Sequence, residues 1–239
     1  MCQRNGGPTY VAQARRNLKF DLKYSSSNYC KQMIKKIILD FETSGLNMYH
    51  DDIIEIAMKE MGTDNEFTCL VHPKSNELIS HRITQITGIT NKILFHEGLP
   101  WKEAYCQAND WLLKTSNGEK LCIVSHNGEV FDFIFLRRLL RDVKHLPEKK
   151  KVLNPDKIIF IDTLLLAKRL ISGRDYYTQN SLCKTLGIEA VGCHRALNDV
   201  IALEKLFNEL IQKLNAELNK RQNVYEHPQM IHDYLTMRI

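Results

Sequence analysis

Residues 37–46 read Ile-Ile-Leu-Asp-Phe-Glu-Thr-Ser-Gly-Leu, an apolar run that leads into two acidic residues and a turn. Such a run is suited to a short, buried β-strand. Because side chains alternate along a strand, Asp40 and Glu42 project from the same face as Ile38. Both carboxylates are therefore expected at the end of a buried strand, where ligand sites of open α/β sheets tend to lie. The alternative is an exposed strand end with solvated acids.

Two further carboxylates are expected on the apolar stripes of helices. Asp132 and Asp199 each stand near the start of a predicted helix. The leucines that follow them at helical spacing are Leu136 and Leu139 after Asp132, and Leu203, Leu206 and Leu210 after Asp199. Both acids should therefore face the core. Taken alone, an acid in a first helical turn can be a simple partner of the helix dipole.

Buried carboxylates need a partner, and the sequence shows no obvious cation beside these four. If they converge, their repulsion requires divalent cations, and ligation by oxygen alone favours Mg²⁺ or Mn²⁺. Two such ions about 4 Å apart can bind the attacking water and the leaving oxygen of a phosphodiester. His194, five residues before Asp199 in a predicted loop, could take the proton from that water. A histidine of this kind is, by itself, more often structural or solvated.

The bulk composition is that of a globular chain. It has 239 residues, of which 44% are hydrophobic and 26% charged, enough for one large or two small domains. We find no apolar run long enough for a membrane span and no apolar signal region, so we expect an intracellular protein, cytoplasmic or nuclear. Seven cysteines without C-x-x-C spacing indicate a reducing compartment. A zinc site at Cys183, Cys193 and His194 is disfavoured by the ten-residue gap and the missing fourth ligand.

Positive charge is concentrated at the N-terminus. Residues 1–37 contain eight basic side chains and one acidic one, so they carry +7 and the remaining 202 residues carry −2 of the net +5. We expect residues 1–33 to be a basic, flexible leader. Such a leader can attract nucleic acid, can be an idle solvated tail, or can direct the chain to an organelle.

The order of predicted elements indicates an α/β protein. Strands are expected at residues 37–41, 52–59, 66–71, 120–125 and 158–161. Helices are expected within 79–89, at 101–114 and 131–141, after Asp162, and at 181–186 and 197–214. Short connections among the first three strands favour antiparallel pairing, and the later strands alternate with helices, so a mixed sheet with helices packed on it is predicted. Residues 215–239 are expected to be a C-terminal tail that packs on the surface, is disordered or binds a partner.

The motifs resemble those of a known family. Asp-Phe-Glu-Thr-Ser-Gly-Leu, His-Asn-Gly-x-x-Phe-Asp and His-x-x-x-x-Asp occur in the order and spacing of the three motifs of the DnaQ-like (DEDDh) 3′–5′ exonucleases, and the sequence is closest to the proofreading type. The resemblance covers about residues 34–213, and we take 34–214 as the exonuclease domain. All five catalytic positions of the family are present.

The resemblance implies a fold and a role for each site residue. The fold would be ribonuclease-H-like, a five-stranded mixed sheet with helices on both faces. Asp40 would bridge two divalent cations, Mg²⁺ or Mn²⁺. The remaining implied roles are Glu42 and Asp199 completing the tighter metal site, Asp132 supporting the second, His194 acting as general base, Thr43 and Leu46 contacting the terminal nucleotide, and Asn127 and Phe131 lining the groove.

The sequence therefore predicts a metal-dependent 3′–5′ exonuclease that releases nucleoside 5′-monophosphates, with DNA as the expected substrate. RNA is the alternative substrate, because the same catalytic set serves exoribonucleases of this family. An inactive nucleic-acid-binding accessory of a polymerase is the alternative from another class. The expected partners are nucleic acid with a free 3′ end and a polymerase or replication complex, with no membrane involved.

Overall fold

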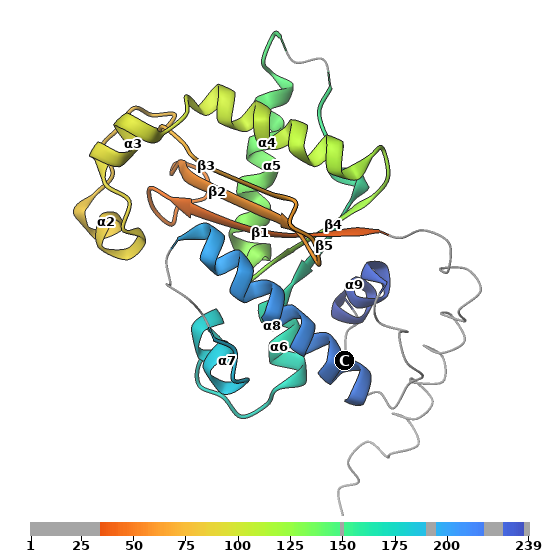
Figure 1. The fold of residues 1–239 in the computed structure, drawn as a ribbon. Coiled ribbons are helices and arrows are strands. Elements are labelled where there is room, and N and C mark those ends of the chain that lie inside the picture. The colour runs from red at the N-terminus through yellow and green to blue at the C-terminus, as the bar shows by residue number, and fades with distance from the viewer. Residues whose placement is uncertain (1–33, 149–150, 190–194, 218–226, 237–239) are drawn as a thin grey trace, which may run out of the picture. The chain divides into compact units, whose positions relative to one another are not determined.

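The computed structural model describes residues 34–148, 151–189, 195–217 and 227–236. The predicted leader, residues 1–33, lies outside these ranges. Five strands form one sheet in the order β3-β2-β1-β4-β5. Their bounds are Lys35–Thr43 for β1, Ile53–Glu60 for β2, Glu66–Leu70 for β3, Leu121–Ser125 for β4 and Ile158–Asp162 for β5. The first three strands pair antiparallel, and β1, β4 and β5 pair parallel, so the sheet is mixed as predicted (Figure 1).

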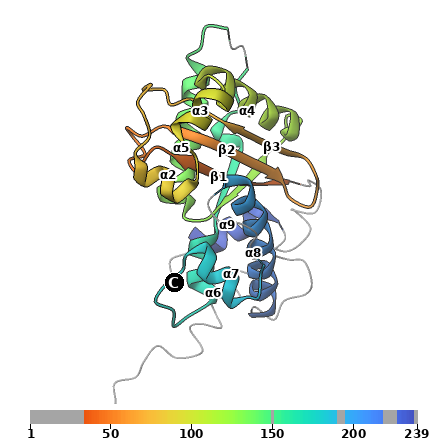
Figure 2. The ribbon, with the colours of Figure 1, turned by 60° about the vertical axis from the view of Figure 1, so that its left-hand side comes forward.

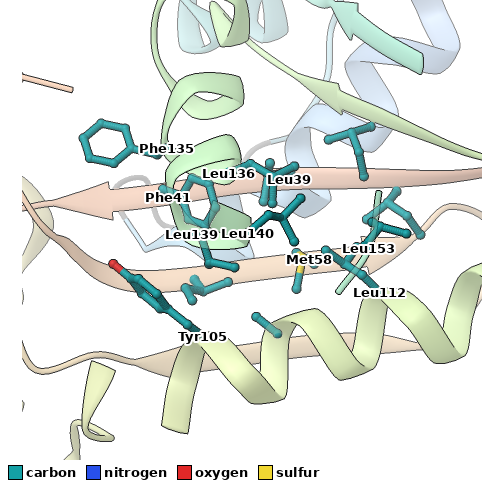
Figure 3. Packing of buried hydrophobic residues seen from close by; sticks show 14 of the residues in the cluster. Leu39, Phe41, Met58, Tyr105, Leu112, Phe135, Leu136, Leu139, Leu140 and Leu153 are labelled. Atoms are coloured by element: carbon teal, nitrogen blue, oxygen red, sulfur yellow. The ribbon is translucent and has the colours of Figure 1, made fainter. Parts of the chain in front are cut away.

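One face of the sheet is covered by two helices, α4 (Trp101–Ser116) and α5 (Asp132–Lys144). On β1, Ile37, Leu39 and Phe41 belong to the main core cluster that both helices share. Figure 3 shows this packing, with Leu39 and Phe41 directed toward the leucines of α5. The helices fit here because their apolar residues recur at helical spacing, which gives each one an apolar stripe to bury.

The opposite face carries the helices of the C-terminal part. The long helix α8 (Ala196–Glu217) contacts β1 and β2, and α6 (Thr163–Leu170) and α7 (Gln179–Thr185) contact α8. A last helix, α9 (Pro228–Thr236), packs against β5 with Met230 and Ile231 buried. Figure 2 shows α6, α7 and α8 together on the side of the sheet away from α4. Helices on both faces of a five-stranded mixed sheet confirm the predicted fold class.

Several element predictions differ from the structure. The helix predicted within residues 79–89 is present as α2 (His81–Thr87), which Gly88 ends in a left-handed conformation, but a second helix that was not predicted, α3 (Asn91–Glu97), begins after its cap Thr90. Within the predicted tail, α8 continues to Glu217 and α9 follows. Two short 3₁₀ turns, Gly128–Val130 and Pro155–Lys157, precede α5 and β5. None of the helices in the described ranges combines the length and apolar composition that crossing a membrane requires.

Asp162 holds together the segments that follow β4 and β5. This buried residue ends β5, and its Oδ1 accepts hydrogen bonds from the backbone N–H of Asn127 at 3.0 Å and of Leu164 at 2.8 Å. Its Oδ2 accepts from the N–H of Glu129 at 3.1 Å. The same carboxylate therefore caps α6, as predicted, and holds the connection between β4 and α5.

We predict that Asp162→Ala lowers the free energy of unfolding by about 2–3 kcal/mol, because a helix cap is lost and buried N–H groups are left without an acceptor. The matched control is Thr178→Ala, which removes a single cap bond to Ser181 N at the start of α7 and should cost about 1 kcal/mol. Urea unfolding followed by circular dichroism measures both. Equal losses for the two variants would contradict the role given to Asp162.

Candidate active site

The candidate site lies at the end of β1. Asp40 and Glu42 project from the face opposite Leu39 and Phe41, because side chains alternate along the strand. That face is covered by α8, whose first turn carries Asp199. Carboxylate oxygens of Asp40, Glu42 and Asp199 all lie within 4.8 Å of one another. Three of the four acids singled out in the sequence thus meet at one point.

Asp132 lies beside this group without being part of it. It begins α5 and is 3% exposed. Its Oδ2 accepts a hydrogen bond from the Ser125 hydroxyl at 2.6 Å, and its Oδ1 accepts one from the Phe41 N–H at 3.2 Å. The ladder between β1 and β4 ends at the Ile38–Val124 pair, which leaves the Phe41 N–H free to bind this carboxylate. The backbone of β1 therefore orients Asp132 directly.

The acids perturb one another. Burial raises the pKa of Asp40 well above its usual range, and the negative charges of Asp132, Glu42 and Asp199 raise it further. Burial, followed by the charge of Asp199, raises the pKa of Glu42 to about 8. Burial raises the pKa of Asp132 to about 7, although its two hydrogen bonds oppose the rise. Without cations, the group would therefore hold protons near neutral pH.

This donor set suits hard divalent cations. The clustered ligand atoms are all carboxylate oxygens, which favour Mg²⁺ or Mn²⁺ over softer metals. A cation would also replace the protons that burial and repulsion retain on Asp40 and Glu42. The residues present thus fit the metal centre that the sequence analysis expected.

One cation does lie close to the acids, contrary to the interpretation of the sequence. The Arg195 guanidinium binds Glu55 on β2, with Nη2 2.8 Å from Oε1. Its charge is close enough to lower the pKa of Glu42, although burial and the neighbouring carboxylates outweigh that effect. Sequence reasoning missed Glu55, although an acid within an otherwise apolar strand was a usable signal.

The turn after β1 is tightly closed. Thr43 donates from its hydroxyl to the Gly45 carbonyl at 2.6 Å, and Ser44 N–H donates to the Asp52 carbonyl at 2.8 Å. A Cβ at Gly45 would collide with the Asp51 carboxylate, so a larger residue there would displace this side chain from its hydrogen bond with the Asn47 N–H. The turn leaves Leu46 81% exposed. A substrate-contacting role for Thr43 and Leu46 stays a prediction.

The remaining predicted site residues are Asn127, Phe131 and His194. Asn127 is exposed in a left-handed conformation with φ 64°, and the Phe131 ring packs edge-on against Phe135 with centroids 5.0 Å apart. Their role in lining a groove stays a prediction. His194 lies outside the described residues, directly before Arg195, and its role as general base also stays a prediction. Gln179, missed in the sequence, donates to the Asp199 carbonyl at 2.9 Å.

The mixed sheet with helices on both faces makes this an α/β protein. The carboxylate oxygens at the end of its central strand form a candidate divalent-metal centre. The model of the RNase T family, which is described as an exonuclease, matches residues 37–207. That match covers well over half of the chain, and it includes all five residues that the motifs singled out. The chain therefore belongs to the RNase T/DnaQ-like family of 3′–5′ exonucleases, which confirms the resemblance.

Two relatives place the domain in different contexts. The chain is 30% identical over 204 residues to a PolC-type DNA polymerase III of Thermotoga petrophila, and the aligned part is 83% of this chain but 13% of that polymerase. It is 28% identical over 182 residues to the DNA polymerase III subunit epsilon of Aquifex aeolicus, with 74% of this chain and 81% of that subunit aligned. The chain thus spans only a small part of the PolC-type relatives.

Solved structures share the fold. The Escherichia coli exonuclease I complex with single-stranded DNA has 20% identity and a TM-score of 0.61, covering 79% of this chain and 42% of that one. Exonuclease X in complex with 5′ overhanging duplex DNA has 24% identity and a TM-score of 0.52, covering 82% of this chain and 99% of that one. At these identities, the likeness concerns the fold.

We predict that Asp40→Asn raises the melting temperature of the metal-free protein by at least about 2 °C at pH 8, and by less at pH 5. The folded-state pKa of Asp40 is raised, so the folded chain binds a proton more tightly than the unfolded chain. Stability is therefore lost as pH rises from the unfolded pKa, near 4, toward the folded one. About 2–4 °C corresponds to 1 kcal/mol at this chain length.

Scanning calorimetry in EDTA checks this prediction. Asp64→Asn, in the exposed turn between β2 and β3, is the control and should leave the melting temperature unchanged at both pH values. A lower melting temperature for Asp40→Asn at pH 8 would contradict the account of mutual repulsion.

Proposed function

We propose that this chain is a metal-dependent exonuclease that hydrolyses phosphodiester bonds at the 3′ end of nucleic acid and releases nucleoside 5′-monophosphates. The observation that carries the proposal is the approach of the Asp40, Glu42 and Asp199 oxygens to within 4.8 Å at the end of β1, in a chain of the exonuclease family. DNA is the proposed substrate, because the relatives are parts of DNA polymerases by name.

Each candidate site residue would have a distinct role in hydrolysis. Asp40, Glu42 and Asp199 would hold one divalent cation, and Asp40 with Asp132 would hold a second. When bound, the cations would neutralise the carboxylates and act as Lewis acids toward the scissile phosphate. His194 would accept a proton from the attacking water on an imidazole nitrogen, as the water oxygen bonds to phosphorus and the upstream 3′ oxygen departs. The Ser125 hydroxyl and the Phe41 N–H would keep Asp132 oriented.

The substrate would approach across the turn that follows β1. Leu46 is an aliphatic side chain held in solvent by a closed turn, and it is available to pack against a terminal base. Thr43, Asn127 and Phe131 would complete the contacts to the last nucleotide. A polymerase or replication complex is the proposed partner, by analogy with the contexts of the relatives.

The direction of hydrolysis is tested with a 5′-labelled, single-stranded DNA oligomer and Mn²⁺. We expect a ladder of shortened products that keep the label, together with free nucleoside 5′-monophosphates, and loss of at least 10³-fold in rate for Asp40→Asn, since a shared metal ligand is removed. An RNA oligomer of the same sequence is run in parallel. Faster cleavage of RNA would replace the proposed substrate, and failure to cut either oligomer would favour an inactive binding module.

His194→Ala should slow hydrolysis by about 10²–10⁴-fold, because a positioned general base contributes about that factor. Binding of Mn²⁺, measured by calorimetry, should be unchanged, since His194 is not proposed as a metal ligand. The control is His145→Ala, at the C-terminal end of α5 and exposed. A wild-type rate for His194→Ala would remove this residue from the proposed mechanism.

A further inference from the structure

Glu55 is a buried carboxylate for which the proposed chemistry has no use. It lies on β2 directly opposite Glu42 on β1, so both side chains project from the same face of the sheet. Glu55 is only 2% exposed. A charged group this deeply buried beside other carboxylates has to be paired.

Within the described residues, the Glu55 carboxylate accepts hydrogen bonds from Arg195, directly before α8, and from the first residue of α8. Oε1 accepts hydrogen bonds from Arg195 Nε at 3.1 Å and Nη2 at 2.8 Å. Oε2 accepts from the backbone N–H of Ala196, the first residue of α8, at 3.1 Å. A carboxylate at this position also interacts favourably with the positive end of the helix dipole. Glu55 therefore caps α8 from a strand 140 residues earlier in the chain.

A second link joins the same two elements further along. Lys59 Nζ lies 2.8 Å from Glu204 Oε2, and Gly62 N–H donates to Glu204 Oε1 at 2.6 Å. Glu55 and Lys59 are four residues apart on β2, or about 13 Å. Ala196 and Glu204 are eight residues apart on α8, or about 12 Å. Because the spacings match, both links can form at once, the Glu55 link at the start of α8 and the Lys59 link about two helical turns further on.

The link between Glu55 and Arg195 is the one that bears on the candidate metal centre. The Asp199 N–H donates to the Arg195 carbonyl at 3.1 Å, so Asp199 stands one helical turn after the residue that Glu55 holds. A shift of the helix start would carry the Asp199 carboxylate away from Asp40 and Glu42, whose positions are set by the β1 ladder.

We propose that Glu55 and Arg195 are positioning residues that hold the start of α8, so that Asp199 completes the metal site with Asp40 and Glu42. The proposal rests on the proposed function for the identity of that site. We name this pair of residues the β2–α8 clamp.

Charge and position predict opposite effects of losing Arg195. If Arg195 acted only through its charge, its removal would leave the site more negative, and Mn²⁺ would bind more tightly. If Arg195 positions Asp199, its removal should weaken Mn²⁺ binding, and residues that orient metal ligands typically contribute about 10–100-fold in affinity. The direction of the change therefore separates the two roles.

The experiment is calorimetric titration of the full chain with Mn²⁺, without substrate. We expect Arg195→Ala to weaken Mn²⁺ binding by about 10-fold or more. Because this variant leaves Glu55 buried and unpaired, the double variant Glu55→Gln, Arg195→Ala is measured as well. The double change alters no net charge, so charge alone predicts unchanged binding, whereas loss of the clamp predicts weaker binding. Lys59→Ala is the matched control, because it breaks the other link between β2 and α8.

The Mn²⁺ affinities of the variants, compared with one another, test the β2–α8 clamp. Weaker Mn²⁺ binding in both Arg195 variants, with near wild-type binding in Lys59→Ala, supports the clamp. Unchanged or tighter binding in the double variant overturns it, as does an equal loss in Lys59→Ala. Failure of the proposed function is distinguishable, because the wild-type chain would then bind Mn²⁺ and cut neither DNA nor RNA, or would bind no Mn²⁺ at all.

Discussion

Mutual repulsion among carboxylates is the constraint on which the catalytic end of this protein depends. Three of them approach within 4.8 Å, and a fourth, Asp132, is buried beside them. Neither burial nor charge favours this arrangement, and the raised pKa values of Asp40, Glu42 and Asp132 express that cost. The surrounding fold must therefore supply the stability that holds the group together in the absence of cations.

The fold supplies this stability because a different structural element holds each acid in place. Asp40 and Glu42 belong to a strand paired on both sides, so the ladder sets their positions. Asp132 is oriented by a hydroxyl of β4 and a free N–H of β1, where the parallel ladder ends. Asp199 depends on the register of α8 along β2. Since each support involves backbone groups or buried partners, the ligands can be arranged before any cation arrives.

How much of the fold and of the candidate site could be predicted depended on whether the relevant residues lie close together in the sequence. The strand period was enough to place Asp40 and Glu42 on one face, and helical spacing was enough to bring Asp199 to the core side of α8. Glu55 stood out locally as an acid within an apolar run, but its partner Arg195 lies 140 residues away, and no local pattern shows which residue pairs with it. The inference that no cation stood near the acids was also wrong, because Arg195, four residues before Asp199, lies close enough to lower the pKa of Glu42. Helix α3 was missed because Leu94 is the buried residue among its seven, so it has no apolar stripe at helical spacing.

The candidate site and the residues that support it lie within the region shared with the relatives. The region shared with the relatives is 81% of the epsilon subunit of Aquifex aeolicus but 13% of a PolC-type polymerase, so one unit occurs in very different surroundings. All the acids of the candidate site lie between residues 40 and 199, inside the 37–207 family match. The residues that hold them, Ser125, Glu55 and Arg195 among them, lie inside it too. The acids of the candidate site and the residues that hold them therefore belong to the same family unit, and the proposed metal centre requires no residue from outside it.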